Sequence, residues 1–435
     1  MKTAVIGLGL TGVSVVHYLQ QKGDSVIAFD TRPALPAADE LRKQYPDMLI
    51  QLGDLSPLLQ CGVDRLVVSP GVPLEESVLR EMAARKIPFV SDIDLFLENN
   101  SAKLIAITGS NGKTTVTSWV GQCLQSLGYR VNVCGNIGTP VLSTLGEGEF
   151  DFLVMELSSF QLDLCRPIRA DVAACLNVSP DHLDRHGTLG NYRAAKMKIF
   201  QGASNVVMSA DSNSGFEYLP DSAQQAFSFS CHSEATVRYV TDEKILQWED
   251  GFSLAVDQLK SQNNIAIVNA AAVLAILTAA GIEREQSCQV IVQCESLKHR
   301  FQIVAEKEGV RYINDSKATN VGSAIVSVQT AAQQSERVVL IAGGETKESP
   351  LSEWAAVVAQ TCAVVIVYGA DAELMLAALD KLQVKLFLVD DLVEAVSLAK
   401  QQVQPGDAVL LAPAATSWDQ FKNYEERGDL FIKLV

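Results

Sequence analysis

The chain has 435 residues, of which 48% are hydrophobic and 20% are charged. This composition is typical of globular proteins and excludes a disordered or collagen-like chain, and the length predicts about three domains. With 35 basic against 51 acidic residues the formal net charge is −16, which disfavours general nucleic-acid binding because phosphate backbones are held by clustered Lys and Arg.

The cysteines and the apolar runs indicate the compartment. The nine cysteines form no C-x-x-C pair and no Cys/His metal spacing, which is typical of reduced thiols in a reducing environment. No apolar stretch reaches the roughly 18 residues of a membrane-spanning helix. The short apolar N-terminal run contains glycines and leads into a folded pattern, unlike a signal peptide. We therefore expect a cytoplasmic protein without membrane insertion.

Short apolar runs alternate with amphipathic stretches along the chain, a rhythm typical of βαβ units and parallel sheets in α/β proteins. Most of the runs are continuously apolar, as expected for strands that are buried on both faces. Helices are expected over Val116–Leu127 and over an Ala-rich stretch, Asn269–Ala280. The predicted strands are Thr3–Ile6, Val26–Phe29, Leu66–Val68, Leu104–Ile107, Phe152–Met155, Val172–Leu176, Val310–Ile313, Val338–Ile341, Val364–Val367, Lys385–Val389 and Ala408–Leu411.

Two candidate domain boundaries interrupt this pattern. One lies near Ser91–Ala102, ahead of a new strand, and the other lies near Ser296–Arg300, after the Ala-rich helix. The stretch Ser212–Asp257 shows only weak alternation, which leaves antiparallel and irregular structure both open.

The first motif is Gly7-Leu8-Gly9-Leu10-Thr11-Gly12, between a predicted strand and a helical stretch, with Asp30 at the end of the next strand. In this context G-x-G-x-x-G indicates a dinucleotide such as NAD on a helix N-terminus. Two other interpretations remain open: a nucleotide-sugar pyrophosphate on the same helix end, or a tight strand-to-helix turn without a ligand. Backbone N–H groups of Ser69-Pro70-Gly71 follow another strand and would face the same crevice.

The second motif runs from Thr108 to Thr115, T-G-S-N-G-K-T-T, again between a strand and a helix. Its glycines allow backbone N–H groups to close around a phosphate. Lys113 supplies a charge for the β- and γ-oxygens, and the Thr114 hydroxyl is a ligand for Mg²⁺. A nicotinamide dehydrogenase has no use for such a loop. The motif therefore favours a nucleoside triphosphate as ligand.

Polar residues follow two further buried strands. Glu156 ends the strand Phe152–Met155, and His182 lies between two aspartates in N-V-S-P-D-H-L-D-R-H. Carboxyl ends of parallel strands line the ligand crevice of a sheet, and Mg²⁺ prefers hard oxygen ligands. Glu156 is therefore a candidate metal ligand. For His182 a structural role and a role in the site are equally open.

These blocks resemble the Mur ligases. The similar segments are G-L-G-L-T-G, T-G-S-N-G-K-T-T, M-E-L-S-S-F-Q-L, N-V-S-P-D-H-L-D-R-H-G, Y-R-A-A-K, H-R-F, N-D-S-K-A-T-N and A-P-A-A-T-S-W-D-Q-F-K-N-Y-E-E-R-G-D, in this order over nearly the whole chain. Folylpolyglutamate synthetases share the central loop and the general plan but not the terminal blocks.

The resemblance implies an α/β fold of three domains. These are an N-terminal Rossmann-like domain (1–92) for the UDP-sugar, a central P-loop domain with a mainly parallel sheet (93–297) for ATP, and a C-terminal Rossmann-like domain (298–435) for the amino acid. It also implies an ATP-dependent amide ligase of peptidoglycan synthesis, which joins D-glutamate to UDP-N-acetylmuramoyl-L-alanine through an acyl phosphate. The alternatives are a related Mur or folylpolyglutamate-type ligase with another amine, and, in a different class, an NAD-dependent oxidoreductase. We expect a monomer that acts on small molecules only.

The resemblance also implies a role for each matching residue. Lys113, Glu156, His182, Lys196 and Lys317 are the expected catalytic residues. The expected ligands of Mg²⁺, of which two ions are expected, are Thr114, Glu156, His182 and Lys196, with Lys196 carbamylated. ATP is expected at Gly109, Ser110, Asn111, Gly112, Lys113, Thr114, Thr115, Asn269, Arg300 and Asp315. The UDP-substrate is expected at Leu10, Thr11, Asp30, Thr31, Arg32, Ser69, Gly71, Asn136 and Ser158, and D-glutamate at Thr319, Lys347, Ser417 and Tyr424.

Two positions differ from the family pattern, and without the resemblance one residue has another interpretation. Tyr424 stands where the D-glutamate enzymes often have Phe, and Trp418 stands where a smaller apolar residue is usual. From the residues alone, Lys196 is expected to be a solvated lysine on a helix surface.

Overall fold

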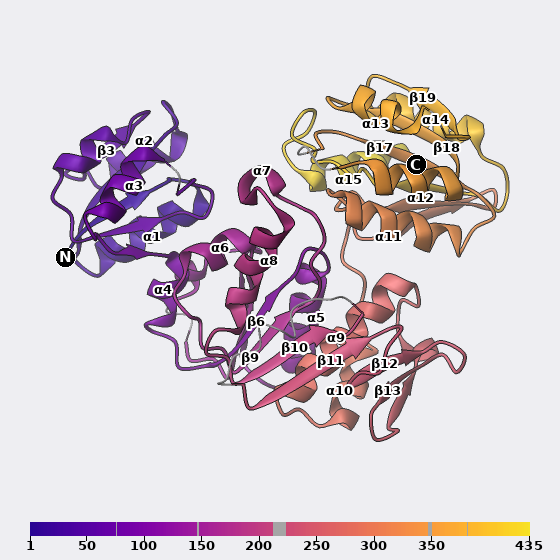
Figure 1. Cartoon of the computed structure of the whole chain (residues 1–435), viewed down its shortest axis with the longest axis horizontal. Helices are drawn as coiled ribbons and strands as arrows, with labels where there is room; N and C mark the ends of the chain where they lie inside the picture. The colour runs from indigo at the N-terminus through magenta and orange to yellow at the C-terminus, as the bar shows by residue number, and fades with distance from the viewer. Residues whose placement is uncertain (75, 146–147, 212–222, 347–349, 381) are drawn as a thin grey trace.

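The computed structural model describes residues 1–435 except 75, 146–147, 212–222, 347–349 and 381. Three sheets follow one another along the chain (Figure 1). The predicted α/β class is confirmed, and each predicted strand is present within two residues at either end. Each sheet lies within one of the ranges 1–92, 93–297 and 298–435, which we keep as proposed domain boundaries.

The N-terminal sheet is parallel throughout, in the order β3-β2-β1-β4-β5. Its central strand β1 pairs with both β2 and β4, so the carboxyl ends of these three strands meet at one edge. Its strands are β1 (Lys2–Ile6), β2 (Ser25–Asp30), β3 (Ile50–Leu52), β4 (Arg65–Val68) and β5 (Phe89–Val90), and its helices are α1 (Leu10–Gln21), α2 (Pro36–Gln44), η1 (Ser56–Gln60) and α3 (Ser77–Ala84).

A short helix, α4 (Asp92–Leu97), begins at the first predicted domain boundary, directly after Ser91. The Ser91 hydroxyl accepts a hydrogen bond from the backbone of Asp94, and the Asp94 carboxylate returns one from the Ser91 backbone, a capping box that starts the helix. Helix α4 packs on the 3-10 helix η2 (Val141–Thr144) and on α1. One hydrophobic cluster therefore runs from the N-terminal sheet into the central one.

The central sheet has the order β14-β13-β12-β11-β10-β9-β6-β8-β7. Strands β6 to β12 pair in parallel, and β12 to β14 form an antiparallel meander. In the described part of 212–257, residues 237–255 thus form the antiparallel meander, whereas β11 pairs in parallel with β10 and β12. The strands are β6 (Lys103–Thr108), β7 (Val131–Gly135), β8 (Phe152–Glu156), β9 (Val172–Cys175), β10 (Asn205–Ser209), β11 (Gln225–Ser230), β12 (Val237–Val240), β13 (Ile245–Trp248) and β14 (Ser253–Ala255).

One face of this sheet is covered by α5, α9 and α10. Helix α9 begins at Asn264, five residues before the predicted start, because Asn263 caps it by accepting a hydrogen bond from Ala266. Helix α5 likewise begins earlier than predicted, inside the glycine-rich loop. The helices are α5 (Lys113–Ser126), α6 (Ser159–Leu164), α7 (Leu183–His186), α8 (Leu189–Met197), η3 (Lys198–Phe200), η5 (Val256–Gln258), α9 (Asn264–Ala279) and α10 (Arg284–Ile291).

The C-terminal sheet has the order β15-β16-β20-β17-β18-β19, parallel except for the pairing of β15 with β16. Its α11 contacts α9 of the central domain. The strands are β15 (Gln302–Lys307), β16 (Val310–Asn314), β17 (Val338–Gly343), β18 (Cys362–Tyr368), β19 (Lys385–Leu388) and β20 (Ala408–Leu411), and the helices are α11 (Val321–Ala332), α12 (Ser352–Thr361), α13 (Ala372–Leu379), α14 (Leu392–Gln402) and α15 (Tyr424–Leu434).

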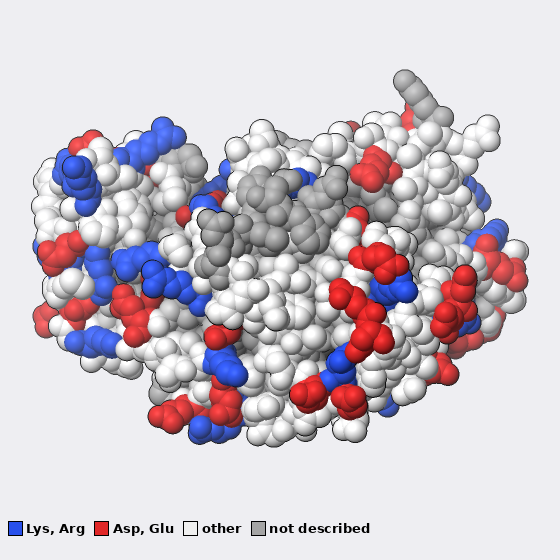
Figure 2. Space-filling model, turned by 60° about the horizontal axis from the view of Figure 1, so that its bottom comes forward, with Lys and Arg blue, Asp and Glu red and all other residues white. Residues whose placement is uncertain are grey.

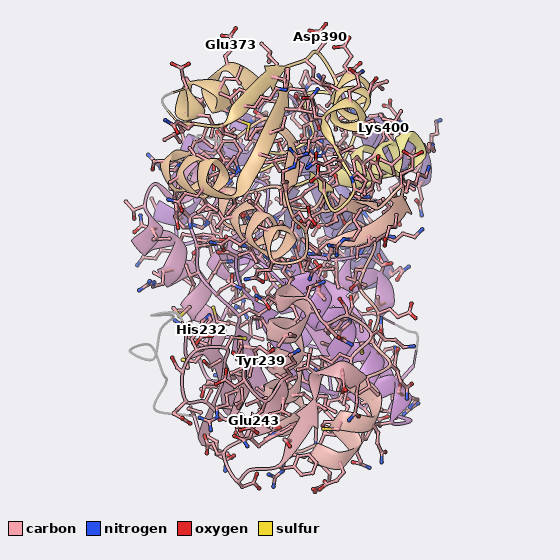
Figure 3. All side chains as sticks on the ribbon, turned by 90° about the vertical axis from the view of Figure 1, so that its right-hand side faces the viewer. His232, Tyr239, Glu243, Glu373, Asp390 and Lys400 are labelled. Atoms are coloured by element: carbon pink, nitrogen blue, oxygen red, sulfur yellow. The ribbon has the colours of Figure 1, made fainter. Side chains whose placement is uncertain are left out.

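Charged side chains of both signs are spread over the surface. On the face in Figure 2, basic and acidic side chains are interspersed in small groups. Figure 3 shows Glu373, Asp390 and Lys400 of the C-terminal domain at the opposite end of the molecule from Tyr239 and Glu243 of the central meander. Among the described residues, no helix is long and apolar enough to cross a membrane.

Candidate active site

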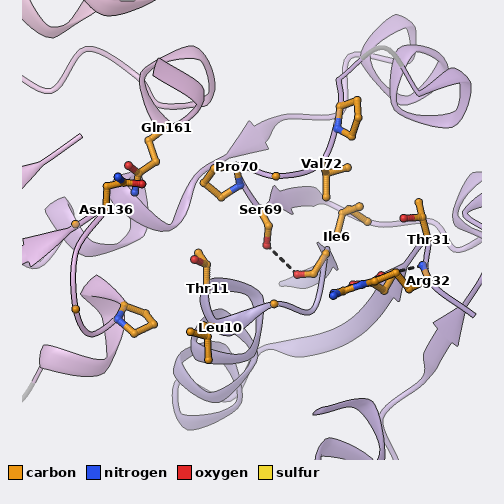
Figure 4. Close-up of a pocket in the computed structure, with 18 residues that line it drawn as sticks. Ile6, Leu10, Thr11, Thr31, Arg32, Ser69, Pro70, Val72, Asn136 and Gln161 are labelled. Atoms are coloured by element: carbon orange, nitrogen blue, oxygen red, sulfur yellow. Dashed lines mark hydrogen bonds and ion pairs between the residues drawn. The ribbon is translucent and has the colours of Figure 1, made fainter. Parts of the chain in front are cut away.

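A cavity of about 550 Å³ lies at the carboxyl ends of β1, β2 and β4 (Figure 4). The turn after β1 forms its floor, and residues after β7 and in α6 form its opposite wall. Of the residues expected at the UDP-substrate, the lining includes Leu10, Thr11, Asp30, Thr31, Arg32, Ser69, Gly71 and Asn136. Ser158 lies behind this wall, where its hydroxyl donates to the side chain of Gln161, a lining residue.

The G-x-G-x-x-G turn is packed too tightly for side chains. A Cβ at Gly12 would lie 1.8 Å from the carbonyl oxygen of Gly7, and Gly7 has a φ of +88°, in the left-handed region. The Ser69 hydroxyl donates to the same carbonyl at 2.8 Å. Gly9 caps α1 with no side-chain hydrogen bond. The first N–H groups of a twelve-residue helix therefore face the cavity, an arrangement that favours an anion.

Asp30 and Arg32 form one unit at the cavity wall. The carboxylate of Asp30 accepts hydrogen bonds from the Leu8 backbone at 2.7 Å and from the Arg32 guanidinium at 2.8 and 2.7 Å. Burial alone would raise the pKa of Asp30, but these hydrogen bonds outweigh it and hold the pKa below its usual value. Both carboxylate oxygens are engaged, and Arg32 is the half-exposed, ligand-facing cation.

The Thr108–Thr115 loop closes around its own lysine. Lys113 Nζ donates to the carbonyls of Gly109 at 2.7 Å and Ser110 at 3.0 Å. Gly112, with a φ of +82°, caps α5, and a Cβ there would lie 2.9 Å from the Asn269 side chain. Asn269, expected at the nucleotide, therefore contacts the loop. The cation and the helix N-terminus are both arranged for a polyphosphate.

Glu156 connects the cavity to the loop. Asn136, a cavity residue, donates to Glu156 Oε1 at 2.9 Å. Glu156 Oε2 is buried, and no hydrogen bond from a described residue reaches it. A buried carboxylate oxygen without a partner costs free energy, and a cation there would satisfy it. The residue therefore fits a Mg²⁺ ligand.

His182 lies close by, in a backbone conformation that few non-glycine residues adopt. Its φ is +53°, and its ring contacts Phe160 with centroids 4.9 Å apart. No cluster of three or more His, Cys, Asp or Glu suited to a metal occurs among the described residues.

Lys196 is buried, so the solvated position expected from the residues alone is wrong. It is 1% exposed, its Nζ donates to the Gly109 carbonyl at 2.8 Å, and it lies 4.5 Å from the centre of the Tyr192 ring. Burial, and then the nearby charge of Lys113, lower its pKa to about 7. Helix α8 points this residue inward because Tyr192 and Met197 anchor it in the core.

The C-terminal domain adds two cations opposite the central site. Burial lowers the pKa of Arg300, and it lowers that of Lys317 to about 8, while the carboxylate of Glu156 opposes both shifts. Lys317 Nζ lies 3.9 Å from the centre of the Tyr424 ring. Asp315 is buried and accepts a hydrogen bond from the Ser327 hydroxyl. Glu156 therefore lies within electrostatic range of cations from two domains, namely Lys113, Lys196, Arg300 and Lys317.

The remaining residues expected at the amino acid lie on loops of the C-terminal domain. Thr319 follows Lys317 closely, and its N–H donates to the Lys317 carbonyl at 2.7 Å. Ser417 is buried, whereas its neighbour Trp418 is 70% exposed. Lys347 lies outside the described residues.

Comparison with known proteins covers the whole chain. Residues 1–91 match the model of the Mur ligase MurD-like N-terminal domain, residues 107–282 that of the Mur ligase middle domain, and residues 299–415 that of the Mur ligase glutamate ligase domain. A UDP-N-acetylmuramoylalanine–D-glutamate ligase of Marinobacter nauticus is 39% identical, with 100% of this chain and 98% of the relative aligned.

The chain is a Mur ligase.

Another relative supports this assignment, and a solved structure shares the fold. A UDP-N-acetylmuramoylalanine–D-glutamate ligase of Saccharophagus degradans is 39% identical over 99% of this Mur ligase and 96% of the relative. The crystal structure of MurF from Acinetobacter baumannii has a TM-score of 0.63 at 18% identity, covering 99% of this chain and 90% of that one. At this identity the structural likeness shows the shared fold.

The structure adds residues to this Mur ligase site that sequence reasoning did not single out. Arg427, in the quoted block E-E-R-G-D, is fully buried and donates to the backbone carbonyls of Ser316, Ala415, Thr416 and Gly343 and to the Ser316 hydroxyl. It joins the loops after β16, β17 and β20. A single sequence carries no sign that this arginine, on a charged helix, points inward.

Replacing Arg427 should therefore destabilise the C-terminal domain. Arg427→Ala leaves several buried carbonyls without a donor, and we expect a loss of about 3 kcal/mol in the free energy of unfolding. Urea denaturation followed by circular dichroism measures it, with the exposed Arg42→Ala as the matched control. An unchanged midpoint for Arg427→Ala would contradict the bracing role.

Proposed function

We propose that this Mur ligase joins D-glutamate to UDP-N-acetylmuramoyl-L-alanine with consumption of ATP, as the names of its full-length relatives state for those proteins. The observation that carries the proposal is the position of Glu156. It meets the cavity suited to a UDP-sugar through Asn136, its strand β8 pairs with β6, which leads into the phosphate loop, and Lys317 of the third domain lies within electrostatic range. All three substrates thus converge on one carboxylate.

The order of events follows from the chemistry. A carboxylate is a poor electrophile, and transfer of the γ-phosphoryl group to its oxygen supplies a leaving group. The amine then attacks the acyl carbon, inorganic phosphate departs, and an amide, ADP and phosphate result. Lys113, Arg300 and Lys317 neutralise phosphate charge, and the loop and the cavity align the reactants. Domain closure is required because the three sites belong to three domains.

Two magnesium ions would be held by Thr114, Glu156, His182 and carbamylated Lys196. When bound, they neutralise and orient the phosphate oxygens. The chain's own residues prepare this site. Lys196 presents its amine beside Gly109 of the loop. With a pKa of about 7, a large fraction of that amine is neutral near neutral pH, and the neutral amine adds CO₂ to give a carbamate and a proton.

The amino-acid substrate would bind at loops of the C-terminal domain. D-glutamate carries two carboxylates, so more than one cation or hydroxyl donor is needed. We place Lys317, Thr319, Ser417 and Tyr424 there, with Tyr424 in contact with Lys317 and the exposed Trp418 next to Ser417 in sequence. At the cavity we place the uridine diphosphate on the α1 N-terminus and Arg32. We also propose a monomeric, cytoplasmic enzyme.

An amine panel tests the proposal. Phosphate release is measured with ATP, Mg²⁺ and UDP-N-acetylmuramoyl-L-alanine in the presence of D-glutamate, L-glutamate, a dibasic amino acid, or a polyglutamate acceptor. We expect release that needs all three substrates and D-glutamate as the preferred amine. Turnover with another amine and none with D-glutamate would assign a related ligase. An NADH titration in parallel tests the oxidoreductase alternative. The assignment to the Mur ligase family argues against that alternative.

A further inference from the structure

One side chain joins the C-terminal domain to the nucleotide loop. Asn320 is the N-cap of α11, and its Oδ1 accepts hydrogen bonds from the backbone and the hydroxyl of Ser323 at 2.9 and 3.0 Å. Its Nδ2 points the other way, across the domain boundary. It donates to Asn111 Oδ1 at 3.1 Å and to Asp181 Oδ2 at 3.0 Å.

These acceptors belong to the nucleotide side of the site. Asn111 lies between Ser110 and Gly112 in the phosphate loop, and Asp181 directly precedes His182. Asn320 and Asp181 are only 7% and 5% exposed. A hydrogen bond to a buried carboxylate is among the stronger ones in proteins, because its loss leaves the charge short of a donor.

The packing beside this contact is close. A Cβ at Gly322, in the first turn of α11, would lie 3.0 Å from Ser179 Oγ and 3.4 Å from Ser179 Cβ. A side chain at this position would be tight, because Ser179 would have to give by a few tenths of an ångström. In Figure 1, α11 is the helix of the C-terminal domain drawn next to the central domain, in agreement with its contacts to α9.

We propose that Asn320 is a positioning residue that couples docking of the C-terminal domain to nucleotide held by the Thr108–Thr115 loop. It lies one residue after Thr319 and three after Lys317, so its contact places the amine-site segment beside Glu156. The role in catalysis rests on the proposed function. Binding is reciprocal by linkage: if nucleotide favours docking, docking raises nucleotide affinity by the same factor.

Two substitutions separate this role from simple helix capping. Asn320→Asp keeps a good N-cap oxygen for Ser323 but removes both donated hydrogen bonds and places a negative charge against Asp181. Asn320→Ala removes the cap and the contact together. If Asn320 serves only as a cap, Asn320→Asp behaves like the wild type. If it couples the domains, Asn320→Asp is impaired at least as much as Asn320→Ala.

The experiment measures Mg·ADP affinity by calorimetry and closure by small-angle scattering of the full chain with and without Mg·ADP. For Asn320→Asp we expect about a tenfold weaker affinity, a smaller decrease in the radius of gyration with nucleotide, and a raised KM for D-glutamate. The matched control is Asn264→Asp, which removes the exposed Asn264–Gln333 hydrogen bond between the same domains, and should bind Mg·ADP like the wild type.

Wild-type affinity and closure in Asn320→Asp would overturn the proposal. If that variant does not fold, Gly322→Ala decides: alanine favours the helix, so a merely structural role predicts unchanged stability and affinity, whereas coupling predicts weaker nucleotide binding. Neither readout depends on the amine. A wild type that closes on Mg·ADP but does not ligate D-glutamate would refute the proposed function and leave the coupling standing.

Discussion

Lys113→Ala should lower kcat by about 10³-fold or more while the protein stays folded. Lys113 donates to the carbonyls of Gly109 and Ser110, at the centre of the phosphate loop. Nucleotide would exchange those carbonyls for phosphate oxygens, and the ammonium would then neutralise charge that grows as the γ-phosphoryl group is transferred. With alanine at position 113, only the remaining cations, Arg300 and Lys317, would neutralise that charge.

The measurement is phosphate release with all three substrates, beside a thermal melt. Lys103→Ala is the matched control, because Lys103 is an exposed lysine on β6, the strand that leads into the loop. Retained turnover in Lys113→Ala would reject the γ-phosphate role. A collapse of the melting temperature would instead show that the lysine holds the loop in the absence of ligand.

Lys196→Ala should lose about 10²-fold in activity, and a short-chain carboxylate such as acetate or formate should restore part of it. The carbamate is an anion, and a small carboxylate that enters the space left by the side chain replaces that anion. Lys198→Ala is the matched control: Lys198 is two residues away, is partly exposed and pairs with Asp163. Loss without rescue would leave the carbamate unsupported.

The pH dependence gives a second test of Lys196. Its folded pKa of about 7 lies below the ordinary value near 10.4, so between these values the unfolded chain binds more protons. In CO₂-free buffer this lysine therefore destabilises the wild type most below pH 7, and the penalty is relieved as the pH rises towards 10. Lys196→Met should accordingly gain more stability over the wild type at pH 6.5 than at pH 9, as measured by urea denaturation. An equal gain at both values would contradict a lowered pKa.

The two glycine turns could be predicted because each depends on neighbours in sequence. A strand, a glycine turn and a helix N-terminus lie within about a dozen residues in both glycine motifs. Gly12 against Gly7 and Gly112 in the left-handed region show why no larger side chain fits. The strands were predictable for a related reason, since those buried on both faces are continuously apolar.

Other features were decided by contacts between distant segments. Lys196 is buried because Tyr192 and Met197 dock α8 on the sheet, and the pattern of one helix does not reveal which of its polar residues turns inward. Arg427 and Asn320 each bind loops that are far away in the sequence. Arg427 and its partner Ser316, for example, are 111 residues apart. The early start of α9 depends on the cap at Asn263, which is a local feature of the sequence.

By itself the sequence determined the α/β class, the two glycine turns and the strand ends that carry polar residues, because these follow from hydrophobic period and from backbone conformations that only glycine reaches easily. Only the tertiary structure decided which of the charged residues come near one another. Glu156 lies within electrostatic range of four cations from two domains, and Asn320 spans the boundary between them, because burial and orientation in the folded chain bring together groups that no spacing in the sequence relates.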